Sequence, residues 1–141
     1  MKNLALLGLC LALASEVWAQ SQSGVETVVL AKTQTSWEGS ALPAYPQGQP
    51  EVTVLRVIIP PKIRLPMHEH PVMTAGVVLS GHLIVETESG EVLHLNAGEA
   101  AAEVVDQWHY GRNDGEEPVE LIVFYAGIRD QPVSIAKPNG Q

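Results

Sequence analysis

Three histidines in this chain are spaced so that they could bind one metal ion. His68 and His70 are separated by a single residue. Successive side chains of an extended strand point to opposite faces, so these two project from one face and Glu69 from the other. His109 follows later, after a series of expected short strands, and Asn113 comes after it. Three neutral imidazoles brought together would suit a divalent transition metal with open coordination positions.

The residues around the first two histidines resemble the first motif of the cupin family. That motif runs glycine, five residues, His-x-His, three or four residues, glutamate, six residues and glycine. Here these places are taken by Lys62, His68, His70, Thr74 and Gly81. The histidines and the last glycine match the motif, whereas the first glycine and the glutamate are replaced.

The residues around His109 resemble the second cupin motif. That motif runs glycine, five residues, Pro-x-Gly, two residues, histidine, three residues and asparagine. Here the same places are taken by Gly98, Val104, Asp106, His109 and Asn113. The spacing is kept throughout, although the proline and the second glycine have become valine and aspartate.

The resemblance implies both a fold and a metal site. The two motifs cover residues 62–113 in register, and cupins are all-β proteins, built as a double-stranded β-helix or jelly-roll barrel. The resemblance also implies that His68, His70 and His109 bind one divalent transition metal. Neutral imidazole suits zinc, iron, copper, nickel or manganese better than calcium, so these five metals all stay open.

Thr74 changes the chemistry that this site favours. Most metal-binding cupins have a glutamate at the place of Thr74, and a threonine hydroxyl is a poor ligand for a divalent ion. The metal would keep its full positive charge and favour an anionic substrate, such as an enolate or carboxylate, that binds it directly. Cupin dioxygenases with three-histidine iron sites work in this way. The resemblance therefore implies a dioxygenase-like metalloenzyme ahead of an isomerase or lyase.

Two other functions stay open beside the enzyme. A non-catalytic cupin that binds a metal or a small ligand would share the same motifs, because a fold does not determine a function. A cupin fold whose site holds no metal is the third possibility.

Glu103 is the candidate catalytic residue. It comes just before Val104, at a place where many cupins have an aliphatic side chain. A carboxylate there could face the cavity as a general base or a distant ligand, or it could point to solvent. His82 and His94 lie outside both motifs, on the two strands of an expected hairpin. They are expected to be surface or cross-strand histidines.

The start of the chain has the features of a secretory signal peptide. Lys2 precedes an apolar run over residues 4–14, and Val17-Trp18-Ala19 offers a cleavage site before Gln20. Residues 1–19 are therefore expected to be removed and the mature protein exported to the periplasm or beyond. The apolar run is too short to span a membrane. Cys10 is the single cysteine and would leave with the signal, so no disulfide is expected.

The charge of the chain limits its partners. The formal net charge is −8 at pH 7, and removal of the signal leaves it unchanged because Lys2 and Glu16 leave together. An acidic surface repels phosphate groups, so nucleic acid is not expected to bind. No later segment is long and apolar enough to span a membrane. The expected partners are a small-molecule ligand or substrate and, by analogy with cupins that pair through sheet edges, a second copy of the chain.

Short apolar runs between turn residues predict an all-β domain without helices. Residues 20–50 are expected to hold an N-terminal strand, over 25–32, and an arm rich in proline and glycine. Residues 51–135 are expected to form the barrel and residues 136–141 a tail. The strongest strand signal covers residues 52–59, which are expected to be buried on both sides for much of their length. Further strands are expected over residues 74–80, 82–87, 92–95, 99–105 and 119–126.

Overall fold

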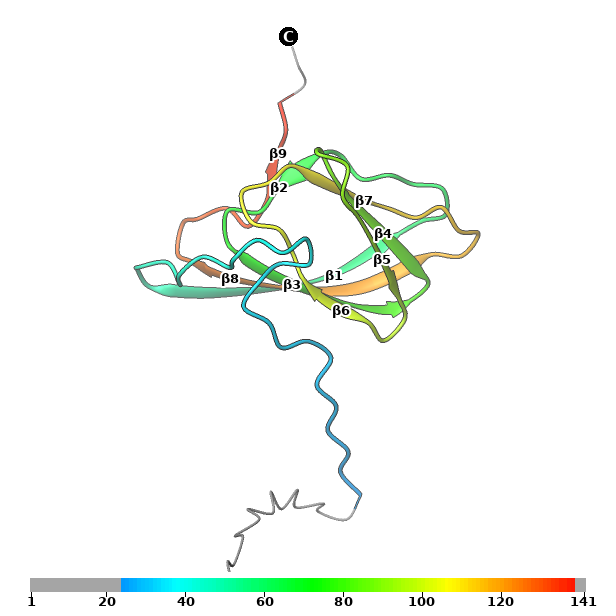
Figure 1. The fold of residues 1–141 in the computed structure, drawn as a ribbon, viewed down its shortest axis with the longest axis horizontal. Helices are drawn as coiled ribbons and strands as arrows, with labels where there is room; N and C mark the ends of the chain where they lie inside the picture. The colour runs from blue at the N-terminus through cyan, green and yellow to red at the C-terminus, as the bar shows by residue number, and fades with distance from the viewer. Residues whose placement is uncertain (1–23, 139–141) are drawn as a thin grey trace, which may run out of the picture.

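The computed structural model describes residues 24–138, in which two antiparallel β-sheets lie face to face (Figure 1). The strands are β1 (Pro50–Ile59), β2 (His68–Glu69), β3 (Met73–Ser80), β4 (His82–Thr87), β5 (Val92–Asn96), β6 (Ala100–Ala102), β7 (His109–Arg112), β8 (Val119–Ile128) and β9 (Ile135–Ala136). The first sheet has the order β1-β8-β3-β6 and the second the order β5-β4-β7-β2-β9. Among these described residues, no helix is long and apolar enough to cross a membrane.

The first sheet is built around β8, which lies between β1 and β3. It pairs with β1 along the whole length of both strands, from Pro50↔Ile128 to Ile59↔Val119. Burial along β8 alternates, because side chains of one parity face the second sheet and the others face outward. The inward side chains are Val119, Leu121, Val123 and Tyr125.

The second sheet contains a tight hairpin and a short strand. In the turn between β4 and β5, the N–H of Gly90 donates to the carbonyl of Thr87 at 3.1 Å. Gly90 has a φ of 97°, a conformation that glycine adopts without steric cost. Strand β2 is only two residues long, and it is held between β7 and β9.

The core lies between the sheets and takes apolar side chains from both. Burial of such side chains supplies most of the free energy that holds a small domain together. The fully buried members of the core are Ile59, Val72, Val78, Leu83, Val85, Leu95, Val119, Leu121, Val123 and Tyr125.

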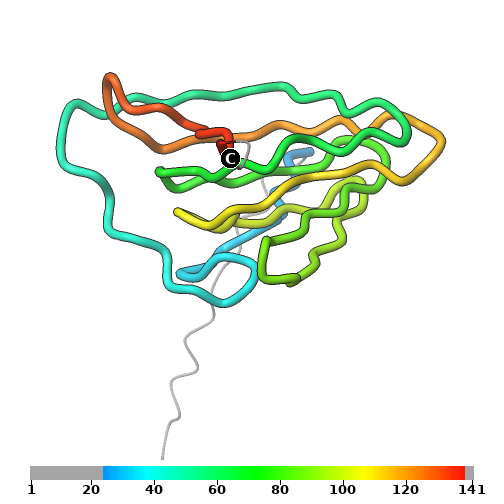
Figure 2. The backbone as a smooth tube through the Cα atoms, turned by 90° about the horizontal axis from the view of Figure 1, so that it is seen from above, coloured from blue at the N-terminus to red at the C-terminus, as the bar shows by residue number. Residues whose placement is uncertain are grey.

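An arm over residues 34–49 connects the two ends of the first sheet. The N–H of Trp37 donates to the carbonyl of Ala102 on β6 at 3.0 Å. The arm then runs along one end of the molecule to the start of β1, as its cyan trace shows in Figure 2. The arm has no regular strand of its own beyond the single bridge Thr35↔Ala41.

Most of the predicted strands are confirmed. β4 has the predicted bounds, while β1, β3, β5 and β8 agree with their predictions within a few residues. β6 is shorter than the strand predicted over residues 99–105. The predicted signal peptide, residues 1–19, and the last three residues of the tail lie outside the described residues.

The strand predicted over residues 25–32 is wrong. This segment extends away from the two sheets (Figure 1) and forms no strand pairing. Its apolar side chains are exposed, and Val29 keeps 71% of its surface accessible. A strand is defined by hydrogen bonds to a neighbour, and the described part of this chain supplies no neighbour here.

The predicted burial of β1 on both sides is also wrong. Val54 is 57% exposed and Ile58 is 53% exposed, because the outer face of the first sheet is left uncovered. The predicted all-β jelly-roll fold is confirmed, but the described strands do not form a closed barrel. Within residues 24–138 the pairing divides the strands into two separate sheets, so the strands enclose the core without closing into one hydrogen-bonded barrel.

Candidate metal centre

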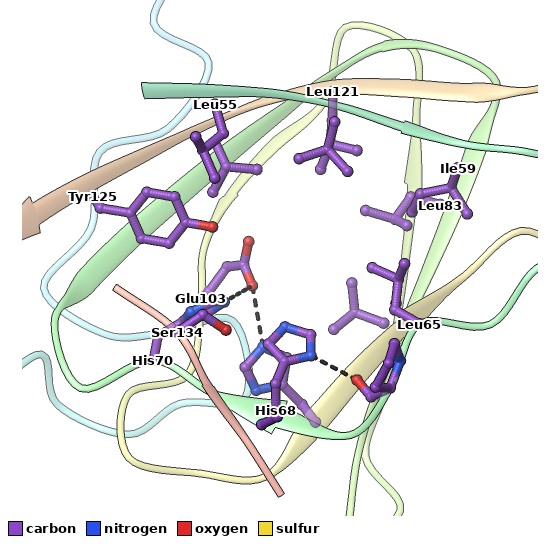
Figure 3. Close-up of a pocket in the computed structure, with 17 residues that line it drawn as sticks. Leu55, Ile59, Leu65, His68, His70, Leu83, Glu103, Leu121, Tyr125 and Ser134 are labelled. Carbon is purple, nitrogen blue, oxygen red and sulfur yellow. Dashed lines mark hydrogen bonds and ion pairs between the residues drawn. The ribbon is translucent and has the colours of Figure 1, made fainter. Parts of the chain in front are cut away.

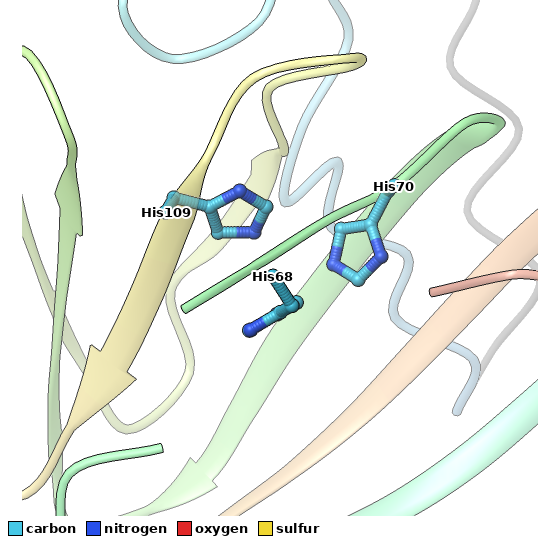
Figure 4. A group of neighbouring side chains, drawn as sticks. All are labelled: His68, His70 and His109. Atoms are coloured by element: carbon cyan, nitrogen blue, oxygen red, sulfur yellow. The ribbon is translucent and has the colours of Figure 1, made fainter. Parts of the chain in front are cut away.

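The structure brings His68, His70 and His109 together at one point between the sheets (Figure 4). His68 on β2 is the direct cross-strand partner of His109 on β7, and His70 follows the end of β2. The ring centroids are 4.6 Å apart for His68 and His109, 4.9 Å for His70 and His109, and 5.0 Å for His68 and His70. Their ligand atoms all lie within 4.8 Å of one another. Convergence of the three imidazoles is therefore confirmed.

A backbone carbonyl fixes the protonation pattern of each ring. The Nδ1 atoms of His68, His70 and His109 each lie 2.8 Å from a carbonyl oxygen, of Pro66, Val133 and Gln107 respectively. A carbonyl oxygen only accepts, so each Nδ1 carries the hydrogen and donates it. In the neutral ring the Nε2 atom then keeps its lone pair. This is the arrangement that orients histidines as metal ligands.

The lone pair of His109 has no hydrogen-bond donor opposite it. Its side chain is 1% exposed, and its Nε2 atom has no hydrogen-bond partner among the described residues. His70 is 3% exposed. A buried polar atom without a partner is uncommon and costs stability. The donor set therefore fits a divalent transition metal, which would bind these Nε2 atoms.

Glu103 reaches the same point from the residue after β6 (Figure 3). Its Oε2 atom lies 3.5 Å from His70 Nε2 and 3.4 Å from His109 Nε2. Burial raises the pKa of Glu103, but its contacts with His109 and His70 lower it more, so the carboxyl is ionised. The sequence left open whether this side chain faces the cavity or solvent, and the structure places it in the cavity.

The pKa values of His68 and His70 are shifted in opposite directions. Burial lowers the pKa of His68 below its usual value, because a charged ring loses hydration. Burial also acts to lower the pKa of His70, but the Glu103 carboxylate outweighs it and raises the pKa. Of these two rings, His68 is therefore the one whose lowered pKa favours the neutral form, which is the form that binds a metal.

A cavity of about 350 Å³ opens beside the three histidines (Figure 3). Its walls are mainly apolar, and no lysine or arginine among the described residues lines it. The apolar lining is formed by Leu55, Val57, Ile59, Leu65, Leu83, Val85, Leu121 and Val123. Such a cavity suits a small molecule with an apolar body and a polar head at the histidines.

Tyr125 and Ser134 add hydroxyl groups to this cavity. The Tyr125 ring lies 5.3 Å from the His70 ring, centroid to centroid. Burial and the charge of Glu103 raise the pKa of Tyr125 to about 12, so its phenol stays protonated and can donate a hydrogen bond. The inward parity of Tyr125 on β8 was the signal that could have identified it from the sequence. No sequence pattern singled out Ser134.

Thr74 is buried beside the centre but does not line the cavity. Its hydroxyl donates to the carbonyl oxygen of Val72 at 3.0 Å. The hydroxyl is thus occupied locally, and Thr74 contributes no ligand atom to the described site.

Two turns in the motifs adopt the left-handed backbone conformation typical of glycine, although another residue stands there. Lys62 has a φ of 60° and Asp106 a φ of 53°, at two places where the cupin motifs have glycine and this chain has another residue. Residues with side chains adopt this left-handed conformation only at a cost. The spacing of the motifs is therefore kept by the backbone geometry rather than by the original residue types.

His82 and His94 lie on the outer face of the β4–β5 hairpin, as expected. Both are exposed, and His82 Nε2 lies 3.0 Å from His94 Nδ1. Asn96 Oδ1 lies 2.9 Å from the other ring nitrogen of His82. This cross-strand contact is separate from the buried centre.

Comparison with solved structures supports the fold. The DMSP lyase DddQ from Ruegeria pomeroyi is 20% identical with a TM-score of 0.55, and the match covers 64% of this chain and 45% of that one. An oxalate oxidase in complex with the substrate analogue glycolate is 24% identical with a TM-score of 0.52, covering 62% and 46%. The chain thus spans less than half the length of these two enzymes, and the likeness concerns the fold.

A third solved structure has a length closer to this chain. It is an uncharacterized conserved protein with a double-stranded β-helix domain from Klebsiella pneumoniae, 23% identical with a TM-score of 0.54. The match covers 67% of this chain and 89% of that one. No curated protein matches the chain.

The family model of the Cupin domain matches residues 55–125. This match takes in half of the chain, including His68, His70, Glu103 and His109. The chain therefore belongs to the Cupin domain family.

Proposed function

We propose that the protein is a metal-dependent enzyme acting on a small anionic molecule, with His68, His70 and His109 as ligands of one divalent transition metal. The observation that carries this proposal is the donation of all three Nδ1 hydrogens to backbone carbonyls, which leaves three Nε2 atoms converging on one buried point. A bound transition metal would supply Lewis acidity toward a chelating ligand and, if redox-active, chemistry with oxygen.

The cavity supports a small monoanionic substrate with an apolar body. A divalent ion and the ionised Glu103 carboxylate together have a net charge of about +1. One negative charge on the bound ligand neutralises it. Burial of uncompensated charge is costly, and within residues 24–138 no lysine or arginine lines the cavity to balance a second negative charge. Enolates and monocarboxylates with apolar substituents fit this description better than dianions.

The chain supplies two groups beside the metal ligands. Tyr125, whose pKa is raised to about 12, is the proposed hydrogen-bond donor to a substrate oxygen. Glu103 is the only carboxylate among the described residues that line the cavity. It is the proposed proton acceptor for a bound substrate. The apolar walls lower the polarity around the site, which strengthens both interactions.

Oxygen uptake tests the dioxygenase-like form of this proposal. The iron-loaded protein is incubated with a panel of enolisable acids and diketones, beside His109→Ala as the inactive variant and His94→Ala as the matched control. We expect uptake with a subset of monoanionic compounds, abolished by His109→Ala only. No uptake across the panel would contradict the proposal. Stabilisation by the same compounds without turnover would instead favour a non-catalytic binding module.

We also propose that the mature protein is exported after cleavage near Ala19. The support is the run of apolar residues over 4–14 with Lys2 before it and the cleavage site Val17-Trp18-Ala19 after it. N-terminal sequencing of protein recovered from the periplasm or medium tests this. A chain that keeps residues 1–19 and stays in the cytoplasm would rule it out.

We further propose a homodimer. Support comes from the apolar segment 25–32, which has no partner strand within the described chain, and from the outer face of the first sheet. Val54, Ile58 and Phe124 lie exposed on that face. Exposed apolar surface of this kind marks interaction sites, and an unpaired edge strand such as β1 can accept an added strand.

A further inference from the structure

Glu103 and Thr74 are neighbours on adjacent strands. The backbone N–H of Glu103 donates to the carbonyl oxygen of Thr74 at 2.8 Å, next to the paired residues Ala75↔Ala102 of β3 and β6. Thr74 stands where the first motif would have its glutamate. Glu103 therefore brings a carboxylate to the same region from the strand beside that position.

The side chains of β3 leave space beside the histidines for the Glu103 carboxylate. The Thr74 hydroxyl is engaged with the Val72 carbonyl at 3.0 Å and does not compete for the site. Gly76 follows on β3, and a Cβ added there would lie 3.5 Å from Glu103 Oε1. A methyl group would just fit, whereas a branched side chain at this position would meet the carboxylate. The glycine thus keeps open the space that the Glu103 side chain occupies.

The distances from Oε2 to two of the three histidines match those between ligands of one metal. Oε2 lies 3.5 Å from His70 Nε2 and 3.4 Å from His109 Nε2. A strong hydrogen bond between a charged nitrogen and a carboxylate is about 2.7–2.9 Å long. Two ligand atoms bound at about 2.1 Å in tetrahedral geometry are about 3.4 Å apart. The contacts are too long for strong hydrogen bonds and have the spacing of neighbouring ligands.

We infer that Glu103 Oε2 is a fourth protein ligand of the metal, in place of the carboxylate that Thr74 lacks. The inference rests on the proposed three-histidine site and adds one ligand to it. The sequence alone predicted a metal that keeps its full positive charge. With Glu103 as a ligand, the net charge of the metal centre is about +1 instead. Ligation through Oε2 leaves Oε1 as the oxygen that can accept a proton.

Metal affinity and ligand geometry test this assignment without reference to activity. Glu103→Gln removes the charge and keeps the shape, and Glu51→Gln makes the same change at an exposed residue of β1. Affinity for Zn²⁺ is measured by competition with a chromophoric chelator, and the visible spectrum of the Co²⁺-loaded protein reports coordination. Thermal unfolding of the metal-free variants checks that each is folded.

We expect Glu103→Gln to weaken Zn²⁺ binding at least about 100-fold, above the 10–100-fold typical of residues that only orient ligands. The Co²⁺ spectrum should change with it, while Glu51→Gln leaves both unchanged. A loss smaller than about 100-fold, or an unchanged Co²⁺ spectrum, would overturn the assignment while the three-histidine site stands. Failure of the unmodified protein to bind Zn²⁺ or Co²⁺ would overturn the proposed function and this inference together.

If Glu103→Gln fails to fold, Glu103→Asp replaces it in both measurements. The shorter side chain keeps the charge and withdraws the oxygen from the histidines. A ligand role predicts weaker Zn²⁺ binding and a changed Co²⁺ spectrum for this variant too. Binding and a spectrum equal to those of the unmodified protein would count against a ligand role.

Discussion

The backbone N–H of Asp106 donates to the carbonyl oxygen of His70 at 2.9 Å. This bond joins the turn before His109 directly to the end of the His68–His70 segment. It places the third imidazole beside the first two. The two cupin motifs are thus held together through backbone contacts as well as through the β2–β7 pairing.

Asp106 should tolerate glycine better than alanine. Its φ of 53° is left-handed, and its side chain is exposed, so backbone conformation dominates the effect of substitution. Asp106→Ala should lower the free energy of unfolding by about 1 kcal/mol, because alanine tolerates this region less well than aspartate. Asp106→Gly should match or exceed the original stability. Urea unfolding measures both, and equal stability of the alanine variant would refute this explanation.

Glu38 should stabilise the arm only above acidic pH. Its carboxylate accepts bonds from Ser40 N–H at 2.9 Å and Gln107 Nε2 at 2.7 Å, and from the Ser36 hydroxyl. Burial raises the pKa of Glu38, but these bonds lower it more, to about 2, from 4.5. A carboxyl whose pKa is lower in the folded protein stabilises the fold when the pH is above the pKa of the unfolded chain. This contribution is lost as pH falls from about 4.5 through about 2.

The comparison of Glu38→Gln with the unmodified protein tests this dependence. The variant should unfold at a lower temperature at pH 7, and the difference should shrink as pH falls below about 4.5. Gln107 also supplies the carbonyl that holds His109 Nδ1, so the arm supports the site indirectly. A difference in unfolding temperature that stays constant with pH would be the contrary result.

Tyr125 should matter for ligand binding more than for folding. Tyr125→Phe removes one hydroxyl from the cavity lining and keeps the buried ring. We expect monoanionic ligands to bind about tenfold more weakly, the effect of one hydrogen bond of about 1.4 kcal/mol. Calorimetric titration measures the affinity and thermal unfolding the stability. Unchanged affinity would exclude Tyr125 as a contact.

Removal of the apolar segment should separate the proposed dimer. Deletion of residues 24–32, or Val54→Lys on the exposed outer face, should convert a dimer to a monomer, because each removes apolar surface available to a second copy. Light scattering coupled to size exclusion gives the mass. Glu51→Gln on the same strand is the control, because it changes the net charge by +1 as Val54→Lys does. A monomeric unmodified protein would dismiss the dimer.

The strands could be predicted because their signals are local. β4 was predicted with the bounds it has, since Gly81 and the turn at Gly90 delimit its apolar run. The strand expected over residues 25–32 failed because pairing depends on a neighbour that a local pattern does not reveal. The burial of β1 failed similarly, because apolar residues at Val54 and Ile58 do not specify what covers them.

The three histidines of the site could be predicted from the sequence, whereas the position of the Glu103 side chain could be predicted only in part. Motif spacing identified His68, His70 and His109. Side chains alternate along a strand, so the first two share a face, and the second motif supplies the third histidine from a neighbouring strand. The spacing also drew attention to Glu103 but could not show that its backbone pairs with Thr74. That relationship depends on the register between β3 and β6, which is a property of the folded chain.

The most direct test of the account is the metal content of the purified mature protein. Elemental analysis should find a stoichiometric transition metal in the unmodified protein and in the His82→Ala, His94→Ala control, whose histidines lie on the exposed hairpin. The metal should be absent from the His68→Ala, His109→Ala variant. Metal retained by that variant, or none in the unmodified protein after reconstitution, would contradict a metal centre at these three imidazoles.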